Sequence, residues 1–493
     1  MKQILKTIAV AAVLLTLNFK LGTLNCSANN LQIGAPTLPS TTTIQFTIQW
    51  DNSWKVLNGG VSTWDAVWVF VKYQDCSTQL WTHVNVTGSS VTGGVLQIDN
   101  AGDGLNKGVF IRRTADAAGN IASATVTLNM TSVTDAGYNY QVFGIEMVRV
   151  PTGSFYVGDG AATWKLGTYN APTTPYQVTT NGLMNLAIDN ASIPNVVPAA
   201  YPEGYDAFYC MKYEISQEQY VGFLNSLTHD QQVNHTAVAP TSPANTYAMT
   251  VGAAIQNRNG IRIITPGIFN TTPAVYGCDF TSGTFNQADD GQNIACNWMN
   301  WNDLIAYLDW AALRPMSEME YEKACRGTVI PVALGYPWDN VTINSATSAA
   351  LTGGTSGLAT ETSTSTADGL CAYLGAAASG PLRVGFAATA ISGRTGAGAT
   401  YYGVMDMGGN VAEQTVMLST IAASNTFTTA AGDGVLTAAG YCNTANTPTF
   451  TLSGTRGGAW NDAVTTYVQM SMRNSTTIEF RNKAAGGRGV RMP

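Results

Sequence analysis

An acidic, glycine-rich stretch near the C-terminal end offers oxygen ligands for a metal ion. It reads Tyr402-Gly-Val-Met-Asp-Met-Gly-Gly-Asn-Val-Ala-Glu413, so Asp406 and Glu413 lie on either side of Gly408 and Gly409. Glycines add backbone freedom that favours a sharp turn over a helix or a strand. Two carboxylates and the free carbonyls of such a turn suit a hard cation such as calcium. The alternative is a turn with two solvated carboxylates.

Thiol and imidazole chemistry has less support. The chain contains three histidines, and none of its eight cysteines lies in a Cys-x-x-Cys motif, the usual signature of zinc and redox sites. In an oxidising compartment some cysteines can pair, and Cys278 with Cys296 is the first pair we expect because they are close in sequence. Buried thiols are the alternative. No G-x-S-x-G, H-E-x-x-H or P-loop motif is present.

Five stretches, in order, resemble the motifs of the formylglycine-generating enzyme (sulfatase-modifying factor) family. The last two resemble the family's G-N-V-W-E and R-G-G-S-W motifs, the latter with the terminal G-F-R. The five are Phe143-Gly-Ile-Glu-Met-Val-Arg-Val-Pro-Thr-Gly-Ser-Phe-Tyr-Val-Gly158, Arg314-Pro-Met-Ser-Glu-Met-Glu-Tyr-Glu-Lys-Ala-Cys-Arg-Gly327, Tyr336-Pro-Trp-Asp-Asn340, Gly409-Asn-Val-Ala-Glu413, and Arg456-Gly-Gly-Ala-Trp460 with Gly489-Val-Arg491. The resemblance implies an irregular C-type-lectin-like fold for residues 143–493.

The resemblance also implies a ligand set for calcium. Asp406 and Glu413 would bind through their side chains, and Gly409 and Val411 through their backbone carbonyls. Such a site consists of oxygen ligands alone, as calcium prefers.

The family's oxidase activity depends on two cysteines after the G-G-S-W motif, which hold copper. Asp462 and Tyr467 stand at those places here. A carboxylate and a phenol are hard ligands, whereas copper(I) prefers thiolates, so we do not expect copper. Another branch of the superfamily holds non-haem iron with three histidines in an added helical domain. This sequence lacks such a domain, so we do not expect iron either.

The family pocket itself would be lined by Trp460, Asp462, Tyr467 and Arg473. An aspartate beside a tyrosine could carry out general acid–base chemistry. The alternative is a relic of the pocket that is filled by side chains.

The elements before residue 143 read as a separate β domain. Thr43 to Trp50 and Ala124 to Met130 alternate apolar and polar residues, which predicts half-buried strands. Asp65 to Lys72 is apolar on both faces and should lie centrally. The spacing fits an immunoglobulin-like β-sandwich at 29–136, followed by a linker at 137–142. Its tryptophans could form a sugar-stacking face or pack in the core; they are Trp54, Trp64, Trp68 and Trp81.

Three helices should support the C-terminal domain, which makes the chain an α+β protein. Ser216 opens a capping box before an apolar stripe, a second helix starts near Trp301, and a third starts at Ser317 with Glu320 as its capping partner. We assign the carboxylates of the third helix to scaffold rather than catalysis; they are Glu318, Glu320 and Glu322.

Long polar insertions separate the motifs. They are rich in Thr, Ser, Ala, Gly and Asn and carry few charges, and they span 159–198, 229–295, 346–399 and 417–448. Loops of this length are uncommon unless they bind something or form local structure. We expect them to build a broad contact surface.

The N-terminal segment and the overall charge indicate the compartment. Residues 1–28 combine Lys2 and Lys6 with a short apolar run and small residues, which is typical of a secretory signal peptide. Lipidation at Cys26 is the alternative. No later stretch is apolar enough to cross a membrane. A net charge of −7, with 11% charged residues and no basic stripe, excludes nucleic-acid binding.

These observations favour a secreted or cell-surface protein that binds or assembles without catalysis. Its partner would be another copy of the chain, a surface protein or a glycan. The alternative is a metal-dependent oxidase or non-haem iron enzyme of the same superfamily.

Overall fold

The computed structural model describes residues 30–57, 62–75, 78–131, 138–281, 283–346, 351–352, 357–358, 360–374, 379–389, 392–418, 426–444, 446 and 448–493. The expected signal peptide and Cys26 lie outside these residues. Strands predominate, and four α-helices occur in the part that is described. No helix there has the length and apolar character needed to cross a membrane.

The N-terminal strands are β1 (Gln32–Ile33), β2 (Thr37–Ser40), β3 (Thr43–Val56), β4 (Thr63–Gln74), β5 (Trp81–Val84), β6 (Val86–Val91), β7 (Leu96–Asn100), β8 (Val109–Arg113) and β9 (Ala117–Met130). The later strands are β10 (Asn139–Val150), β11 (Phe155–Val157), β12 (Leu166–Thr168), β13 (Tyr176–Val178), β14 (Met184–Ile188), β15 (Ala191–Val197), β16 (Phe208–Met211), β17 (Ile261–Thr265), β18 (Val275–Cys278), β19 (Arg314–Pro315), β20 (Asn344–Ser345), β21 (Leu370–Cys371), β22 (Ala412–Val416), β23 (Ser453–Arg456), β24 (Ala485–Gly486) and β25 (Gly489–Arg491). The helices are α1 (Gln217–Leu224), α2 (His229–His235), α3 (Trp301–Trp310) and α4 (Glu318–Arg326), with 3₁₀ helices η2 (Phe450–Leu452) and η3 (Thr465–Val468).

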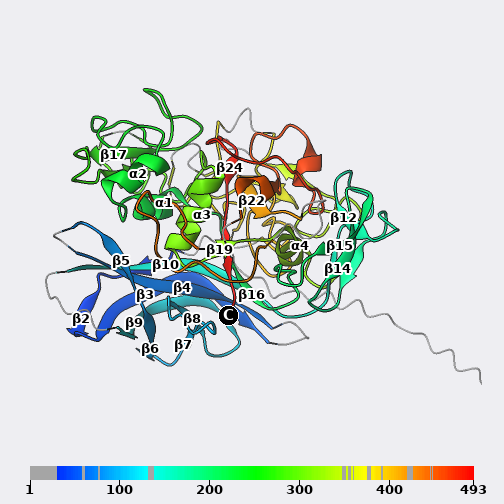
Figure 1. Ribbon diagram of the computed structural model, residues 1–493, viewed down its shortest axis with the longest axis horizontal. Coiled ribbons are helices and arrows are strands. Elements are labelled where there is room, and N and C mark those ends of the chain that lie inside the picture. Colours follow the sequence, from blue (N-terminus) through cyan, green and yellow to red (C-terminus); the bar gives the residue numbers. More distant parts are fainter. Residues whose placement is uncertain are drawn as a thin grey trace, which may run out of the picture.

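Two layers of antiparallel strands form the N-terminal part (Figure 1). In the first layer β3 pairs with β9, and β9 pairs with β6. The alternation predicted for Thr43 to Trp50 is confirmed, because Ile44, Phe46, Ile48 and Trp50 are all buried. In the second layer β4 pairs with β5, β8 and β10.

The central strand β4 joins the two parts of the molecule. On one face Val67, Val69 and Val71 pack against the first layer, and on the other face Trp68 and Phe70 pack into the core of the C-terminal part. This confirms the central position predicted from its apolar character on both faces. β4 pairs with β10 over a long register, so one sheet runs through both parts. Residues 139–142, which we expected in a linker, lie in β10 because they extend this ladder.

Most of the N-terminal tryptophans belong to the core. Trp54, Trp64 and Trp68 are buried, and the indole of Trp68 donates a hydrogen bond to the carbonyl of Ala311 at 2.9 Å. Trp81 differs because it is only half-buried. All three rings belong to hydrophobic clusters that include residues of the C-terminal part.

Capping boxes start the three expected helices. Ser216 with Gln219 caps α1, Asn300 with Asp303 caps α3, and Ser317 with Glu320 caps α4. These local bonds satisfy the first free N–H groups of each helix. The helix α2 was not expected, because its sequence has no apolar stripe. That helix is held by polar side chains: Gln232 donates to the carbonyls of Leu224 and Ala274.

Two features of the C-terminal part bear on the expectations from the sequence. The first insertion forms a small sheet, β12-β14-β15, whose Leu166, Leu186 and Ile188 are buried, so it is ordered within one chain. The pairing of Cys278 with Cys296 is wrong, because both residues are buried free thiols. Burial in the core raises the pKa of each thiol, which disfavours the thiolate that disulfide formation requires.

Candidate functional site

The glycine-rich stretch forms a tight turn that leads into β22. Asp406, Gly409 and Asn410 all have left-handed backbone angles, with φ of 56°, 76° and 59°. A side chain at position 409 would place its Cβ 2.5 Å from the sulfur of Cys371, so only glycine fits. The turn is also anchored by a hydrogen bond from the Gly409 amide to the Gly457 carbonyl at 2.8 Å. The turn expected from the glycines is therefore present.

An arginine lies where the sequence predicted a metal cation. The guanidinium of Arg488 donates to Oε1 of Glu413 at 2.7 Å and to the backbone carbonyl of Asp406 at 3.2 Å. Arg488 is fully buried, and Glu413 and Asp406 are 1% and 5% exposed. The structure thus brings the two predicted carboxylate residues together around a positively charged side chain of the same chain.

A third carboxylate, Glu214, completes this group. It accepts hydrogen bonds from the Val411 amide at 2.9 Å and from the side-chain amide of Asn410. The side chain of Asp406 accepts from the Gly385 amide at 2.5 Å. We call Glu214, Asp406, Glu413 and Arg488 the acidic cluster, since it holds three acidic side chains and one basic one.

Burial dominates the protonation of the acidic cluster. It raises the pKa of Glu214 well above its ordinary value, and the neighbouring Asp406 and Glu413 raise it further. Burial also raises the pKa of Asp406 and that of Glu413 to about 8, although Arg488 opposes the latter shift. For Arg488, burial alone would lower the pKa, but Glu413 and Glu214 raise it above its ordinary value. Arg488 therefore does not reverse the effect of burial on the pKa values of these three acids.

The side chains of this cluster do not fit a calcium ion while Arg488 is in place. One oxygen of Glu413 accepts from the guanidinium, and the other oxygen, Oε2, is buried with no hydrogen-bond partner among the described residues. A calcium ion bound to Glu413 would lie next to a buried positive charge, which is costly in a medium of low dielectric constant. The calcium site predicted from the sequence would require the side chain of Arg488 to move aside, because Arg488 supplies the positive charge there.

Asp462 and Tyr467, which the resemblance places at the positions of the family's two thiols, flank a second glycine turn. A side chain at Gly458 would lie 3.0 Å from Oδ2 of Asp462 and 3.1 Å from the backbone of Tyr467, so both residues border the same turn. Asp462 accepts a hydrogen bond from the Ala459 amide at 2.7 Å, and Tyr467 is 40% exposed. Trp460 is buried and donates to the Lys483 carbonyl at 3.0 Å. The structure thus places three of the four predicted pocket residues in one loop.

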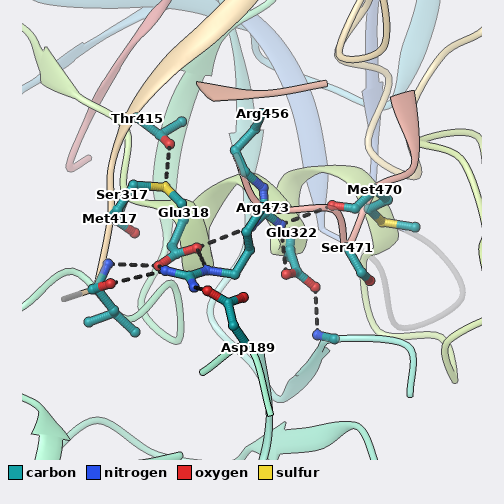
Figure 2. A network of polar contacts seen from close by, with 12 residues as sticks. Asp189, Ser317, Glu318, Glu322, Thr415, Met417, Arg456, Met470, Ser471 and Arg473 are labelled. Carbon is teal, nitrogen blue, oxygen red and sulfur yellow. Dashed lines mark hydrogen bonds and ion pairs between the residues drawn. The ribbon is translucent and has the colours of Figure 1, made fainter. Parts of the chain in front are cut away.

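The fourth, Arg473, belongs to a different group. Its guanidinium binds both carboxylate oxygens of Glu318, at 2.7 and 2.9 Å, and Oδ2 of Asp189 at 2.8 Å (Figure 2). Arg456 binds Glu318 at 3.1 Å and Glu322 at 2.7 Å. We call this group the balanced cluster, because three acids face three arginines. Its members are Asp189, Glu318, Glu322, Arg326, Arg456 and Arg473.

The remaining carboxylate of α4, Glu320, also has a structural role. It closes the capping box with Ser317 and binds Arg314 through two hydrogen bonds of 2.7 and 2.6 Å. The scaffold role that we assigned to the carboxylates of this helix agrees with these contacts.

One thiol lies close to the turn that carries Asp462. Cys371 donates a hydrogen bond to the Gly408 carbonyl at 3.0 Å, and its neighbour Leu374 donates its amide to the Asp462 carbonyl at 2.9 Å. Burial raises the pKa of Cys371 well above its ordinary value, and Asp406 and three further carboxylates add to the shift. Cys371 is therefore a protonated thiol, which is a poor ligand and a poor nucleophile.

Glu214 and Arg488 were not among the site residues predicted from the sequence. Glu214 lies 197 residues from Val411, and Arg488 lies 75 residues from Glu413. No local spacing connects residues so far apart. A search for charged residues in otherwise apolar surroundings would have singled out Glu214, which follows a buried strand, but it would not have identified its partners.

Comparison with known proteins identifies the family. The model of the sulfatase-modifying factor enzyme 1-like domain matches residues 137–493. The chain belongs to this family, as the ordered motifs predicted. No curated protein matches the chain.

Two solved structures show weak similarity. Treponema denticola variable protein 1 is 14% identical, the match covers 71% of this chain and 96% of that one, and the TM-score is 0.28. A second structure, described as "pH-induced modulation of Streptococcus parasanguinis adhesion by Fap1 fimbriae", is 13% identical over 31% of this chain and 84% of that one, with a TM-score of 0.10. Neither score is high enough to assign the fold.

Proposed function

We propose that this protein is a secreted or cell-surface protein that binds and assembles without catalysis, built on a formylglycine-generating-enzyme-like domain. The observation that carries the proposal is the loop after Trp460. Asp462 is engaged in holding that loop, and Tyr467 extends to the surface. Neither side chain can hold copper(I) as a thiolate pair does. The nearby Cys371 is buried and protonated, so it does not replace the missing pair.

The alternative, an iron enzyme of the same superfamily, is less well supported. His235 has both ring nitrogens engaged, Nδ1 with Asp303 at 3.0 Å and Nε2 with the Gly440 carbonyl at 2.8 Å. His83 lies on β5, and its ring contacts Lys72 and the Lys107 carbonyl. Two of the three histidines are therefore committed to structural contacts.

Fold and compartment form part of the proposal. The two-layered N-terminal part supports an immunoglobulin-like sandwich, and the family membership supports a C-type-lectin-like fold for the remainder. A signal peptide at residues 1–28 would direct the protein to the cell surface or the medium. Sequencing the N-terminus of the exported protein would test the cleavage site.

Exposed apolar side chains support association through the insertions. Val251 is 78% exposed, Ile268 62% and Phe269 70%, and all three lie in the insertion that spans 229–295. Neighbouring apolar side chains at a surface commonly mark a contact site. We propose that this insertion contacts a second copy of the chain.

One preparation of residues 29–493 tests the proposal. We expect no aldehyde in a C-x-P-x-R peptide by mass spectrometry, with or without copper, and a mass by light scattering that rises with protein concentration. The double variant Ile268→Ser with Phe269→Ser should shift the protein toward monomer, while Phe480→Ser, a change at a residue that is 78% exposed elsewhere, serves as the matched control. Formation of aldehyde above a no-enzyme control would overturn the non-catalytic assignment. A strict monomer at every concentration would overturn self-association.

A further inference from the structure

The structure describes two Asn-Gly pairs, which differ in their access to solvent. They are Asn181-Gly182 and Asn259-Gly260; a third pair, Asn58-Gly59, lies outside the described residues. Asn181 is exposed in the loop between β13 and β14, at the end of the molecule that carries the small sheet (Figure 1). Asn259 is 1% exposed, and its side-chain amide donates to Asn297. Solvent therefore reaches the side chain of Asn181 but hardly that of Asn259.

An asparagine before a glycine can lose its side-chain amide without an enzyme. The backbone nitrogen of the glycine gives up its proton and bonds to Cγ of the asparagine, the Cγ–Nδ2 bond breaks, and ammonia leaves with that proton. Water then opens the cyclic succinimide at either carbonyl, which yields aspartate or isoaspartate. Because glycine has no side chain, its nitrogen is accessible. At Gly182, where φ is 135°, no atom beyond its chain neighbours lies within 4 Å of the position that a Cβ would take.

A carboxylate lies at the attacking nitrogen of the exposed pair. Both oxygens of Glu203 accept from the Gly182 amide, at 3.0 and 2.9 Å. Glu203 is 2% exposed, so this contact is shielded from solvent. An ionised carboxylate in this place can take the proton as the nitrogen attacks. The Gly260 amide donates instead to Oε1 of Gln217 at 2.8 Å, and a neutral amide is not a base.

The charges around Glu203 set the pH range in which it can act. Burial, against the opposing hydrogen bond from the Gly182 amide, raises the pKa of Glu203 to about 8, and the charge of Asp206 adds to this shift. The nearby cation is Lys323 on α4, whose Nζ donates to the Tyr205 carbonyl at 2.8 Å. Burial lowers the pKa of Lys323 to about 7. The ionised fraction of Glu203 therefore grows as the pH rises toward 8.

A second carboxylate, Asp206, determines what the reaction does to the loop. Its Oδ2 accepts from Nδ2 of Asn181 at 2.6 Å. Loss of ammonia replaces this donor with a carboxylate, and two negative charges then face each other. The segment that carries Asp206 is fixed, because the Tyr205 carbonyl also accepts from the Gly153 amide at 2.9 Å. The loop at residue 181 is therefore the part that moves away.

We propose that Asn181-Gly182 is a self-modifying site, at which Glu203 takes the proton from the attacking nitrogen. Asn181 becomes aspartate or isoaspartate, and the new carboxylate repels Asp206 and releases the loop. Isoaspartate also adds one carbon atom to the backbone before β14. The change is irreversible, so the state of this loop records the age of each molecule. The site lies in the first insertion and goes beyond the proposed association through residues 229–295.

Peptide mapping by mass spectrometry tests the reaction. Residues 29–493 are incubated at physiological temperature in water labelled with heavy oxygen, and the peptides are then separated. We expect the Asn181 peptide to become aspartate and isoaspartate with one heavy oxygen atom, at least about tenfold faster than the Asn259 peptide. No conversion at Asn181, or equal rates at the two positions, would overturn the proposal.

The variant Glu203→Gln tests the base, because it keeps an acceptor for the Gly182 amide but cannot take a proton. We expect conversion at Asn181 to slow at least about tenfold, while the exposed control Glu479→Gln leaves the rate unchanged. In the unaltered protein the rate should level off above pH 8, where Glu203 is ionised, whereas in Glu203→Gln it should keep rising with hydroxide. A rate in Glu203→Gln that equals or exceeds that of the unaltered protein would overturn the role of Glu203.

Hydrogen exchange of residues 183–188 tests the release of the loop. Asn181→Asp places the new carboxylate directly beside Asp206, and we expect exchange to become about fivefold faster. The double variant Asn181→Asp with Asp206→Asn supplies an amide donor from the other side and should restore slow exchange. Unchanged exchange in Asn181→Asp, or no recovery in the double variant, would overturn the release.

Discussion

The acidic cluster and the balanced cluster lie next to each other, and both consist of Asp, Glu and Arg side chains. The acidic cluster has three acids and one arginine, whereas the balanced cluster has three of each. They meet in one ladder, where Glu413 on β22 is paired with Arg456 on β23. Yet Glu413 binds Arg488, while Arg456 binds Glu318 and Glu322. The ring of Tyr321 lies 5.1 Å from the Arg456 guanidinium, and its hydroxyl donates to the Met407 carbonyl at the turn.

The difference shows that the number of neighbouring arginines decides whether the pKa of a buried acid is raised or lowered here. Glu322 and Glu413 are both buried. Burial alone would raise the pKa of Glu322, but Arg456 and Arg326 lower it below its ordinary value. For Glu413 burial raises the pKa, and a single arginine does not reverse the shift. In the balanced cluster the pKa of Glu322 is thus lowered, while in the acidic cluster the pKa of Glu413 is raised to about 8.

The largest effect should come from neutralising one acid of the balanced cluster. Glu318→Gln leaves the buried guanidinium of Arg473 without its main counter-charge. Removing one partner of a buried ion pair typically costs about 3–5 kcal/mol. We expect a loss of this size in the free energy of unfolding, measured by urea denaturation. Glu479→Gln, at an exposed position, is the control and should change stability by less than about 0.5 kcal/mol. Equal effects of the two changes would contradict the comparison.

The acidic cluster should make stability depend on pH. The pKa of Glu413 in the folded state, about 8, exceeds the ordinary value of about 4.3 in the unfolded chain. Between these values the folded state binds more protons, so this contribution is complete at low pH and is lost as the pH rises toward 8. Glu322 acts in the opposite sense, because its lowered pKa contributes stability that is lost only in acid.

Glu214→Gln isolates the contribution of the acidic cluster. Lys72 and Lys323, whose pKa values burial lowers to about 7, add stability as the pH rises, so the wild-type curve alone is ambiguous. The variant removes one titrating acid, and we expect it to lose less stability than wild type between pH 5 and pH 8. At pH 7 the variant should lower the free energy of unfolding by only about 1 kcal/mol, because one hydrogen bond is altered. A variant curve parallel to that of wild type would refute the assignment.

The smallest effect should come from removing divalent cations. Because Arg488 already provides a positive charge at Glu413, we expect a chelator to leave the melting temperature of residues 29–493 unchanged. A ligand bound only to the folded state would raise the melting temperature in proportion to its occupancy. If the chelator lowers the melting temperature, and calcium but not magnesium restores it, then calcium binds and the side chain of Arg488 moves aside.

The sequence by itself determined the features that depend on near neighbours. The capping boxes at Ser216 and Ser317 follow a spacing of three residues, and the buried face of β3 follows a period of two. The family and its ordered motifs were also evident, as was the turn at Gly409. Each of these is encoded within a few consecutive residues, where side-chain type and backbone geometry act directly.

Only the tertiary structure decided which charged residues meet. Arg473 lies 155 residues from Glu318 and 284 from Asp189. We assigned it to the pocket near Tyr467 from its position in the motif, and that position contains no information about these distant partners. In the same way the sequence placed Asp406 and Glu413 together but not Arg488 between them. Coulomb energy in a buried site depends on distances in space and on the local count of charges. Neither quantity can be read from the order of residues along the chain.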